Sequence, residues 1–209
     1  MISEMTMNAG KPQETEAGNA MLERMNSRHN EMALWALGYL DFSVTRDILD
    51  VGCGGGRNIQ NMVQMSQAHV QGIDYSTASV KKSKETNAEA IAAGRVDVMA
   101  GSADALPFAP QSFDIITAFE TIYYWPNILQ CFTNIRELLR EGGTFMVFNE
   151  DYHPDTESNR EVMAALQATM HTPEQLVELF TQAGFRQIEL HLHDNGKWLC
   201  ICGKSLRES

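Results

Sequence analysis

The chain has 209 residues, enough for one domain with a full hydrophobic core, and its 27 acidic and 16 basic side chains give a net charge of −11. Binding along DNA or RNA needs a basic surface, and the one dense basic run is residues 81–84, so we expect no nucleic-acid partner. No apolar run is long enough to span a membrane and no leader is recognisable, which predicts no membrane partner and a cytoplasmic location.

The N-terminal part of the chain divides into an arm and a helix. Residues 1–19 are polar and show no apolar period, so we expect a disordered or loosely attached arm, with residues 20–209 forming a single domain. Apolar side chains recur at helical spacing over residues 20–40, which predicts a helix. His29 lies on the same stripe and is either a packed helix residue or a residue that faces a ligand.

A glycine-rich loop follows the first predicted strand. Residues 48–51 are mostly branched and apolar, and Gly52, Gly54 and Gly56 come directly after them. Glycine allows positive φ and a close approach of the backbone to a ligand. Helical spacing resumes at Asn58, and the N-terminus of a helix favours an anionic group. The spacing is G-x-G-x-G and differs from the G-x-G-x-x-G of dinucleotide-binding loops.

A second strand, residues 70–74, ends in Asp74, about 22 residues after Gly52. A carboxylate at that place binds the ribose hydroxyls in nucleotide-binding βαβ units. The glycine loop and Asp74 together therefore predict a nucleotide-containing ligand.

The rest of the chain alternates helices and strands. Ser76 or Thr77 caps a helix that runs to Ala93 and stops at Gly94, and Thr172 caps a helix that opens with Pro173. We expect strands at residues 95–100, 113–119 and 144–148, helices at 127–140, within 155–170 and at 172–183, and a final hairpin of 185–193 and 197–203.

The final hairpin turns at Asn195-Gly196, which pairs Asp194 with Lys197. This register places two histidines and two cysteines on one face, and leucines and an isoleucine on the other: His191, His193, Cys200 and Cys202 against Leu190, Leu192, Leu199 and Ile201. The spacing is that of alternating strand residues and not that of a zinc finger, so we predict free thiols and no metal site.

Five motifs in order resemble the class I S-adenosylmethionine-dependent methyltransferases. They are residues 50–56, 72–76, 101–108, 112–116 and 138–143, and the similarity covers about residues 45–205. The resemblance implies an α/β fold with a doubly wound, seven-stranded, mostly parallel sheet of order 3-2-1-4-5-7-6 whose last strand is antiparallel. It also implies S-adenosyl-L-methionine as cofactor and no metal.

The resemblance assigns residues to the site. The cofactor-binding residues would be Asp50, Gly52, Cys53, Gly54, Gly56, Asn58, Asp74, Tyr75, Ser76, Ala103, Asp104, Phe119 and Glu120. The N-terminal helix would cover the pocket, as would an insertion near residues 150–171, so that Met25, Arg28 and His29 face the ligand. Glu120, His29 and Tyr123 are the catalytic candidates, and the choice of a general base stays open among Glu120, His29, His153 and His171.

Three functions are compatible with these patterns. The first is methyl transfer to a small or medium-sized organic acceptor, by a monomer or homodimer. The absence of an Asn-Pro-Pro-Tyr or Asp-Pro-Pro-Tyr tetrad after residue 119 disfavours amide or exocyclic amino nitrogens as acceptors. The second is a cofactor-binding regulatory or protein-modifying protein, and the third is a nicotinamide-dependent oxidoreductase, which the glycine spacing disfavours.

Overall fold

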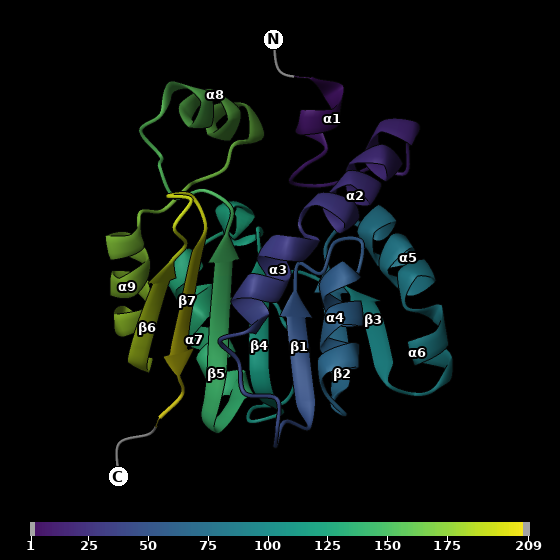
Figure 1. Cartoon of the computed structure of the whole chain (residues 1–209), viewed down its shortest axis with the longest axis vertical. Coiled ribbons are helices and arrows are strands. Elements are labelled where there is room, and N and C mark those ends of the chain that lie inside the picture. The colour runs from purple at the N-terminus through teal and green to yellow at the C-terminus, as the bar shows by residue number, and fades with distance from the viewer. Residues whose placement is uncertain (1–2, 207–209) are drawn as a thin grey trace.

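The computed structural model describes residues 3–206 and places a seven-stranded sheet at the centre of the molecule (Figure 1). The strand order is β3-β2-β1-β4-β5-β7-β6, and β7 runs antiparallel to both of its neighbours, as predicted. The strands are β1 (Asp47–Val51), β2 (His69–Asp74), β3 (Val96–Ala100), β4 (Phe113–Phe119), β5 (Leu139–Asn149), β6 (Arg186–Leu192) and β7 (Leu199–Lys204).

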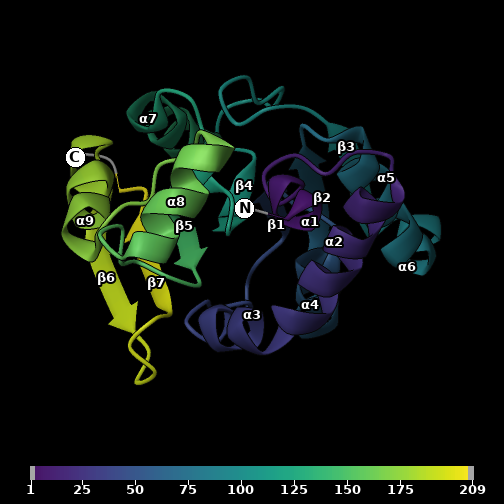
Figure 2. The same cartoon turned by 90° about the horizontal axis from the view of Figure 1, so that it is seen from above.

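Helices cover both faces of the sheet (Figures 1 and 2). On one face Met32, Ile59 and Met62 pack into a cluster with strand residues, and on the other Phe132 and Phe180 do the same. The helices are α1 (Glu4–Met7), α2 (Glu16–Arg28), α3 (Asn30–Leu37), α4 (Arg57–Met65), α5 (Thr77–Thr86), α6 (Ala88–Ala92), the 3₁₀ turn η1 (Ile122–Tyr124), α7 (Ile128–Leu138), α8 (Glu157–Leu166) and α9 (Pro173–Gln182).

The final hairpin has the predicted register. His191 pairs with Cys200 and Leu190 pairs with Ile201, so the side chains alternate between the two faces as expected. Ile201 lies in the cluster with Phe132, and Cys200 lies in the cluster with Met32, whereas Leu190 at the sheet edge is exposed. All four cysteines are free and buried. Within residues 3–206 no group of His, Cys, Asp and Glu is arranged to hold a metal ion.

Two predicted helices are each divided in the structure. The helix expected over residues 20–40 is split at His29 into α2 and α3, and the one expected to end at Ala93 is split at Asn87 into α5 and α6. Asn87 Nδ2 donates hydrogen bonds to the carbonyl oxygens of Ser83 and Gly56, so its side chain competes with the helical backbone. α2 and α3 are anchored separately to the glycine loop and α4, which sets the direction of each.

The N-terminal arm differs from the expected loose segment. Residues 3–14 form α1 and a stretch that lies across the carboxyl ends of β1 and β2 (Figure 2). Residues 1–2 of the arm and residues 207–209 of the domain lie outside the described residues. Among residues 3–206, no helix has the length and apolar character required to cross a lipid bilayer.

Candidate functional site

The glycine loop joins β1 to α4 and has three residues with positive φ. Gly52, Gly54 and Gly56 have φ values of 77°, 51° and 80°. A Cβ on Gly52 would meet Thr121, and a Cβ on Gly56 would meet Asn87 and Ser83. A Cβ on Gly54 would have no atom within 4 Å and would enter open space. The backbone at Gly54 therefore has free space beside it, which a close approach of a ligand requires.

Asp74, at the end of β2, holds the glycine loop in place. Its Oδ2 accepts a hydrogen bond from the Gly54 N–H at 2.9 Å, and its Oδ1 accepts one from the Ser76 N–H at 2.9 Å. The Ser76 side chain in turn caps α5. Burial raises the pKa of the Asp74 carboxyl, and the two backbone donors oppose this shift. The carboxylate is thus oriented by the loop that it supports.

Asp50 lies beneath the loop and not at its surface. It is buried, its Oδ1 accepts a hydrogen bond from Thr117 Oγ1 at 2.7 Å, and its Oδ2 has no partner among the described residues. Burial raises the pKa of Asp50 to about 7, the Thr117 hydrogen bond lowers it, and the nearby charge of Asp74 raises it. Asp50 is therefore a buried residue beneath the glycine loop, and it is not among the lining residues of the three cavities described below.

Three cavities meet at the carboxyl edge of the sheet. The first, here the Tyr75 cavity, has about 340 Å³ of empty volume and lies between the ends of β1, β2 and η1. Its lining includes Gly52, Asp74, Tyr75, Ala103, Thr121 and Tyr124. Asp104, which was predicted to bind the cofactor together with Ala103, is exposed and is not among the lining residues.

The second cavity, the Arg57 cavity, has about 480 Å³ of empty volume between α2 and the glycine loop. It is lined in part by Asn26, Cys53, Arg57, Asn58, Phe119 and Phe148. The third, the α8 cavity, has about 1120 Å³ of empty volume between α2, α8 and the ends of β4 and β5. Figure 2 shows α1 and α2 on one side of this opening and α8 on the other.

Five residues connect the cavities. Gly52 lines both the Tyr75 and the Arg57 cavities, and Tyr124 lines the Tyr75 and α8 cavities. The Arg57 and α8 cavities share Met25, His29 and Glu120. A ligand that fills the Tyr75 and Arg57 cavities would therefore lie next to the α8 cavity.

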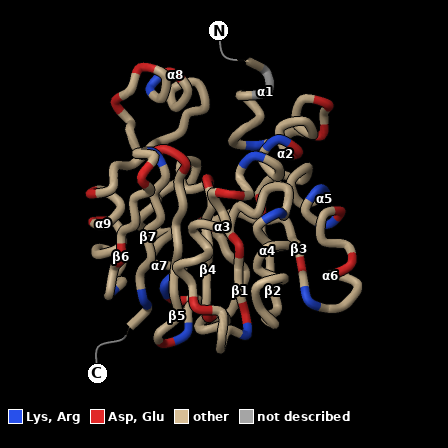
Figure 3. Tube along the Cα trace, in the orientation of Figure 1, with Lys and Arg blue, Asp and Glu red and all other residues tan. Residues whose placement is uncertain are grey.

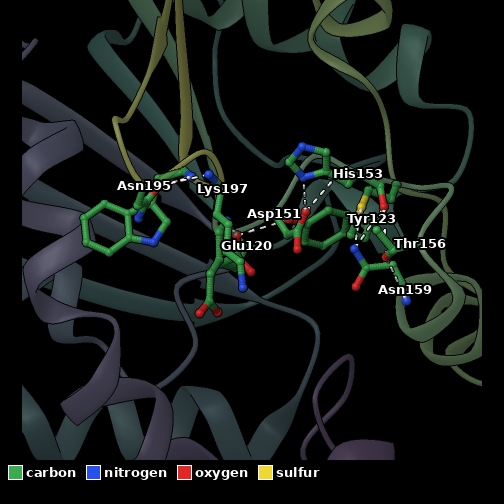
Figure 4. A network of polar contacts seen from close by, with 11 residues as sticks. Glu120, Tyr123, Asp151, His153, Thr156, Asn159, Asn195 and Lys197 are labelled. Carbon is green, nitrogen blue, oxygen red and sulfur yellow. Dashed lines mark hydrogen bonds and ion pairs between the residues drawn. The ribbon is translucent and has the colours of Figure 1, made fainter.

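Glu120 is the acid at this junction, and Figure 4 shows it with its polar neighbours. It follows β4 directly and has a φ of 56°. Its carboxylate accepts hydrogen bonds from the Glu150 N–H and from the Tyr123 hydroxyl, the latter at 3.1 Å. Burial raises the pKa of Glu120 to about 8, although both hydrogen bonds oppose the rise. Burial also raises the pKa of Tyr123, so this hydroxyl remains a hydrogen-bond donor.

His29 lies at the break between α2 and α3 and lines both the Arg57 and the α8 cavities. Its Nε2 is 3.5 Å from a Glu150 carboxylate oxygen. Burial lowers the pKa of His29, Glu150 raises it, and Arg28 and Arg24 lower it. The structure therefore brings His29, Glu120 and Tyr123 to one cavity. His153 and His171 are not among its lining residues.

The arm contacts the end of β2 beside the Tyr75 cavity. Tyr75 donates its hydroxyl to the carbonyl oxygen of Gly10, and Ser76 donates its hydroxyl to that of Pro12, both at 2.5 Å. The Lys11 ammonium lies 5.0 Å from the centre of the Tyr75 ring. The arm is thus attached through side chains at the end of β2, where the ribose end of a nucleotide would bind.

Some site residues were not predicted from the sequence. Asn26 Nδ2 donates a hydrogen bond to the Gly55 carbonyl at 3.0 Å, and Arg57 Nε donates one to the Asn26 carbonyl at 3.3 Å. Thr121 fills the space beside Gly52. A contact such as that of Asn26 joins residues far apart in the chain, and no local pattern indicates it.

Comparisons with known proteins agree with this geometry. The profile of the family described as "Methyltransferase domain" matches residues 43–198. The O-methyltransferase resE of Aspergillus sclerotiorum is 28% identical over 166 residues, covering 77% of this chain and 63% of that protein. The O-methyltransferase rstn1 of Aspergillus nomiae is 30% identical over 148 residues, covering 68% of this chain and 65% of that protein. The chain spans less than two thirds of the length of these relatives.

A solved structure shares the fold. Phosphoethanolamine N-methyltransferase 2 of Haemonchus contortus, in complex with S-adenosyl-L-methionine, superposes with a TM-score of 0.79 at 16% identity. The match covers 99% of this chain and 61% of that one.

Proposed function

The chain belongs to the class I S-adenosylmethionine-dependent methyltransferases, and from this membership we propose that it methylates a hydroxyl or amino group of a small organic acceptor bound in the α8 cavity. The observation that carries the proposal is the position of Glu120, where the Arg57 and α8 cavities meet. The cofactor of the family is S-adenosylmethionine, which supplies an electrophilic methyl group on a sulfonium centre when it is bound.

The residues present fit this cofactor. Gly54 leaves open space where a side chain would otherwise enter the site. The Tyr75 cavity, with Asp74 at its edge, would hold the ribose and adenine. The Arg57 cavity would hold the amino-acid end, because the Arg57 guanidinium and the N-terminus of α4 both favour its carboxylate. This placement directs the sulfonium end toward Glu120.

Glu120 would serve as the general base. The acceptor oxygen or nitrogen forms its bond to the methyl carbon while the bond from that carbon to sulfur breaks. Sulfur keeps the electron pair of the broken bond, and the acceptor proton passes to Glu120. A pKa of about 8 suits this role, since a base is most effective when its pKa is near the working pH. Tyr123 would orient the Glu120 carboxylate through its hydroxyl.

The walls of the α8 cavity would position the acceptor. Alignment of nucleophile, methyl carbon and sulfur supplies much of the catalysis in a displacement of this kind. His29, next to Glu150, is the alternative base and lines the same cavity. The cytoplasmic location and the monomeric or homodimeric state remain predictions from the sequence.

The test begins with calorimetry, in which we expect binding of S-adenosylhomocysteine and no binding of NAD. A methyl-transfer screen with a labelled donor then covers hydroxyl and amino acceptors, whole-cell protein and RNA. We expect label in small molecules, and Glu120→Gln should lower kcat by at least a hundredfold with unchanged S-adenosylhomocysteine affinity. Glu161→Gln, an exposed position on α8, is the matched control. Absence of S-adenosylhomocysteine binding, or label only in protein or RNA, would contradict the proposal.

A further inference from the structure

Three basic side chains line the α8 cavity. Arg24 and Arg28, one helical turn apart on α2, both line it, and Lys197 lines it from the turn between β6 and β7. Figure 3 shows basic positions on α2 and acidic positions at the adjacent ends of the strands, on the same side of the molecule. Three cationic side chains around one cavity are unexpected in a chain whose net charge is −11.

The acidic side chains that line the cavity are Glu120, Glu150 and Asp151. Asp151 accepts a hydrogen bond from His153 Nδ1 at 2.9 Å. Glu150 faces His29 at 3.5 Å, and the Glu120 carboxyl accepts hydrogen bonds from the Glu150 N–H and the Tyr123 hydroxyl. Within residues 3–206, the guanidinium of Arg28 and the ammonium of Lys197 make no hydrogen bond or ion pair with a neighbouring side chain. The cavity therefore has positive charge available to a ligand.

Apolar side chains line much of the rest of the α8 cavity. They come from α2, α8 and the segment after α8, and they are Met21, Met25, Val162, Met163, Leu166 and Met170. Methionine side chains adapt to flat or irregular apolar groups. A ligand that fits this arrangement has an apolar body with a polar group at each end.

We propose that the methyl acceptor is an organic anion, whose carboxylate or phosphate binds Arg28 and Lys197 and whose hydroxyl or amino group faces Glu120 across an apolar body. This inference rests on the proposed function, since it names the substrate class of the same site. Guanidinium groups bind carboxylate and phosphate through paired N–H donors, which fixes the orientation of the bound acid. The length of the apolar body then selects the group that reaches Glu120.

A binding experiment tests the inference separately from turnover. Full-length protein saturated with S-adenosylhomocysteine is titrated with hydroxy acids on benzoic, cinnamic and eight-carbon aliphatic scaffolds, each with its neutral amide and its phosphate counterpart. We expect the anion of at least one scaffold to bind at least tenfold more tightly than its amide. The carboxylate and phosphate arms show which anion is preferred. Equal affinity of anion and amide on all three scaffolds would overturn the inference.

Variants assign the preference to the basic side chains. Arg28→Ala and Lys197→Ala should each weaken anion binding at least fivefold and leave amide binding unchanged, whereas Arg28→Lys should retain most of the preference. Arg160→Ala, an exposed arginine on α8 outside the cavity lining, is the control. An equal loss in Arg160→Ala would overturn the inference. Methylation of neutral acceptors as fast as anionic ones would overturn it and leave the proposed function intact, whereas failure to bind S-adenosylhomocysteine would contradict the proposed function itself.

Discussion

Replacing Glu120 with glutamine should make the protein more stable, increasingly so as the pH rises from about 4.5 to about 8. Burial raises the pKa of Glu120 from 4.5 to about 8, so the folded state holds a proton that the unfolded state releases between these values. The contribution of Glu120 to stability is complete below pH 4.5 and is lost as the pH rises to 8. One pKa unit corresponds to about 1.4 kcal/mol, which sets an upper limit of about 5 kcal/mol for this loss. Because the carboxyl borders a cavity open to water, we expect about 2 kcal/mol.

Denaturant unfolding of the wild type, Glu120→Gln and Glu161→Gln at pH 5.5 and pH 8.5 measures this effect. The free energy of unfolding of Glu120→Gln should exceed that of the wild type by less at pH 5.5, where only the first part of the loss has occurred, than at pH 8.5, where we expect about 2 kcal/mol. Asp50 also has a raised pKa, of about 7, but it is present in all three proteins and cancels in the comparison. A difference between Glu120→Gln and wild type that is the same at both pH values would refute the assignment of a raised pKa to Glu120.

The remaining predictions concern the cofactor site and use the affinity for S-adenosylhomocysteine, measured by calorimetry. Asp74→Ala removes the acceptor that holds the Gly54 N–H and should weaken binding at least tenfold, since a charge-assisted hydrogen bond is worth about 1.5–3 kcal/mol; an unchanged affinity in a folded variant would contradict this. The Gly54→Val variant should fold but should not bind S-adenosylhomocysteine. The Gly52→Val variant should unfold, because its side chain would collide with Thr121. The reverse pattern would contradict the assignment of the cavity. Deleting residues 1–12 removes the backbone acceptors of Tyr75 and Ser76, and it should speed dissociation of S-adenosylhomocysteine at least threefold in stopped-flow measurements, with little change in Tm.

The features of the fold that could be predicted are those that depend on neighbouring residues. The glycine turn after β1, the cap at Thr172 and the register of the last hairpin all follow from short patterns. Asn195-Gly196 determines the pairs near the turn, such as Leu192 with Leu199, whereas the register shifts between Arg186 and Glu189. The strand order came from the resemblance to a family, since no local pattern determines which strands become neighbours.

Features that depend on distant contacts could not be predicted. The periodicity of residues 20–40 indicates one helix, but Asn26 binds the glycine loop and Asn30 accepts a hydrogen bond from Asn61 on α4, so the two halves follow different directions. The arm was expected to be unattached because its hydrogen bonds to Tyr75 and Ser76 use backbone carbonyl groups. Every residue has such a group, so no sequence pattern indicates these bonds. Ala103 lines the Tyr75 cavity but Asp104 does not. Which of two consecutive side chains faces a cavity depends on the path of the loop, and no short sequence pattern determines that path.

Glu120 combines two unfavourable features at the point where the cavities meet. Its φ of 56° is costly for a residue with a side chain, by about 1–3 kcal/mol, and its carboxyl is removed from most of the water that would ionise it. Glycine or asparagine at this position would relieve the backbone strain, and any apolar side chain would avoid the burial of an acid. The surrounding structure holds the residue nonetheless, because its N–H donates to the Phe148 carbonyl at 2.9 Å and its carboxylate accepts from the Glu150 N–H. These bonds join the ends of β4 and β5 and fix the acid before a ligand arrives. A residue that lowers stability in two ways and is held this firmly is best explained by chemistry at that position, which is why the proposed mechanism centres on Glu120 and not on the histidines nearby.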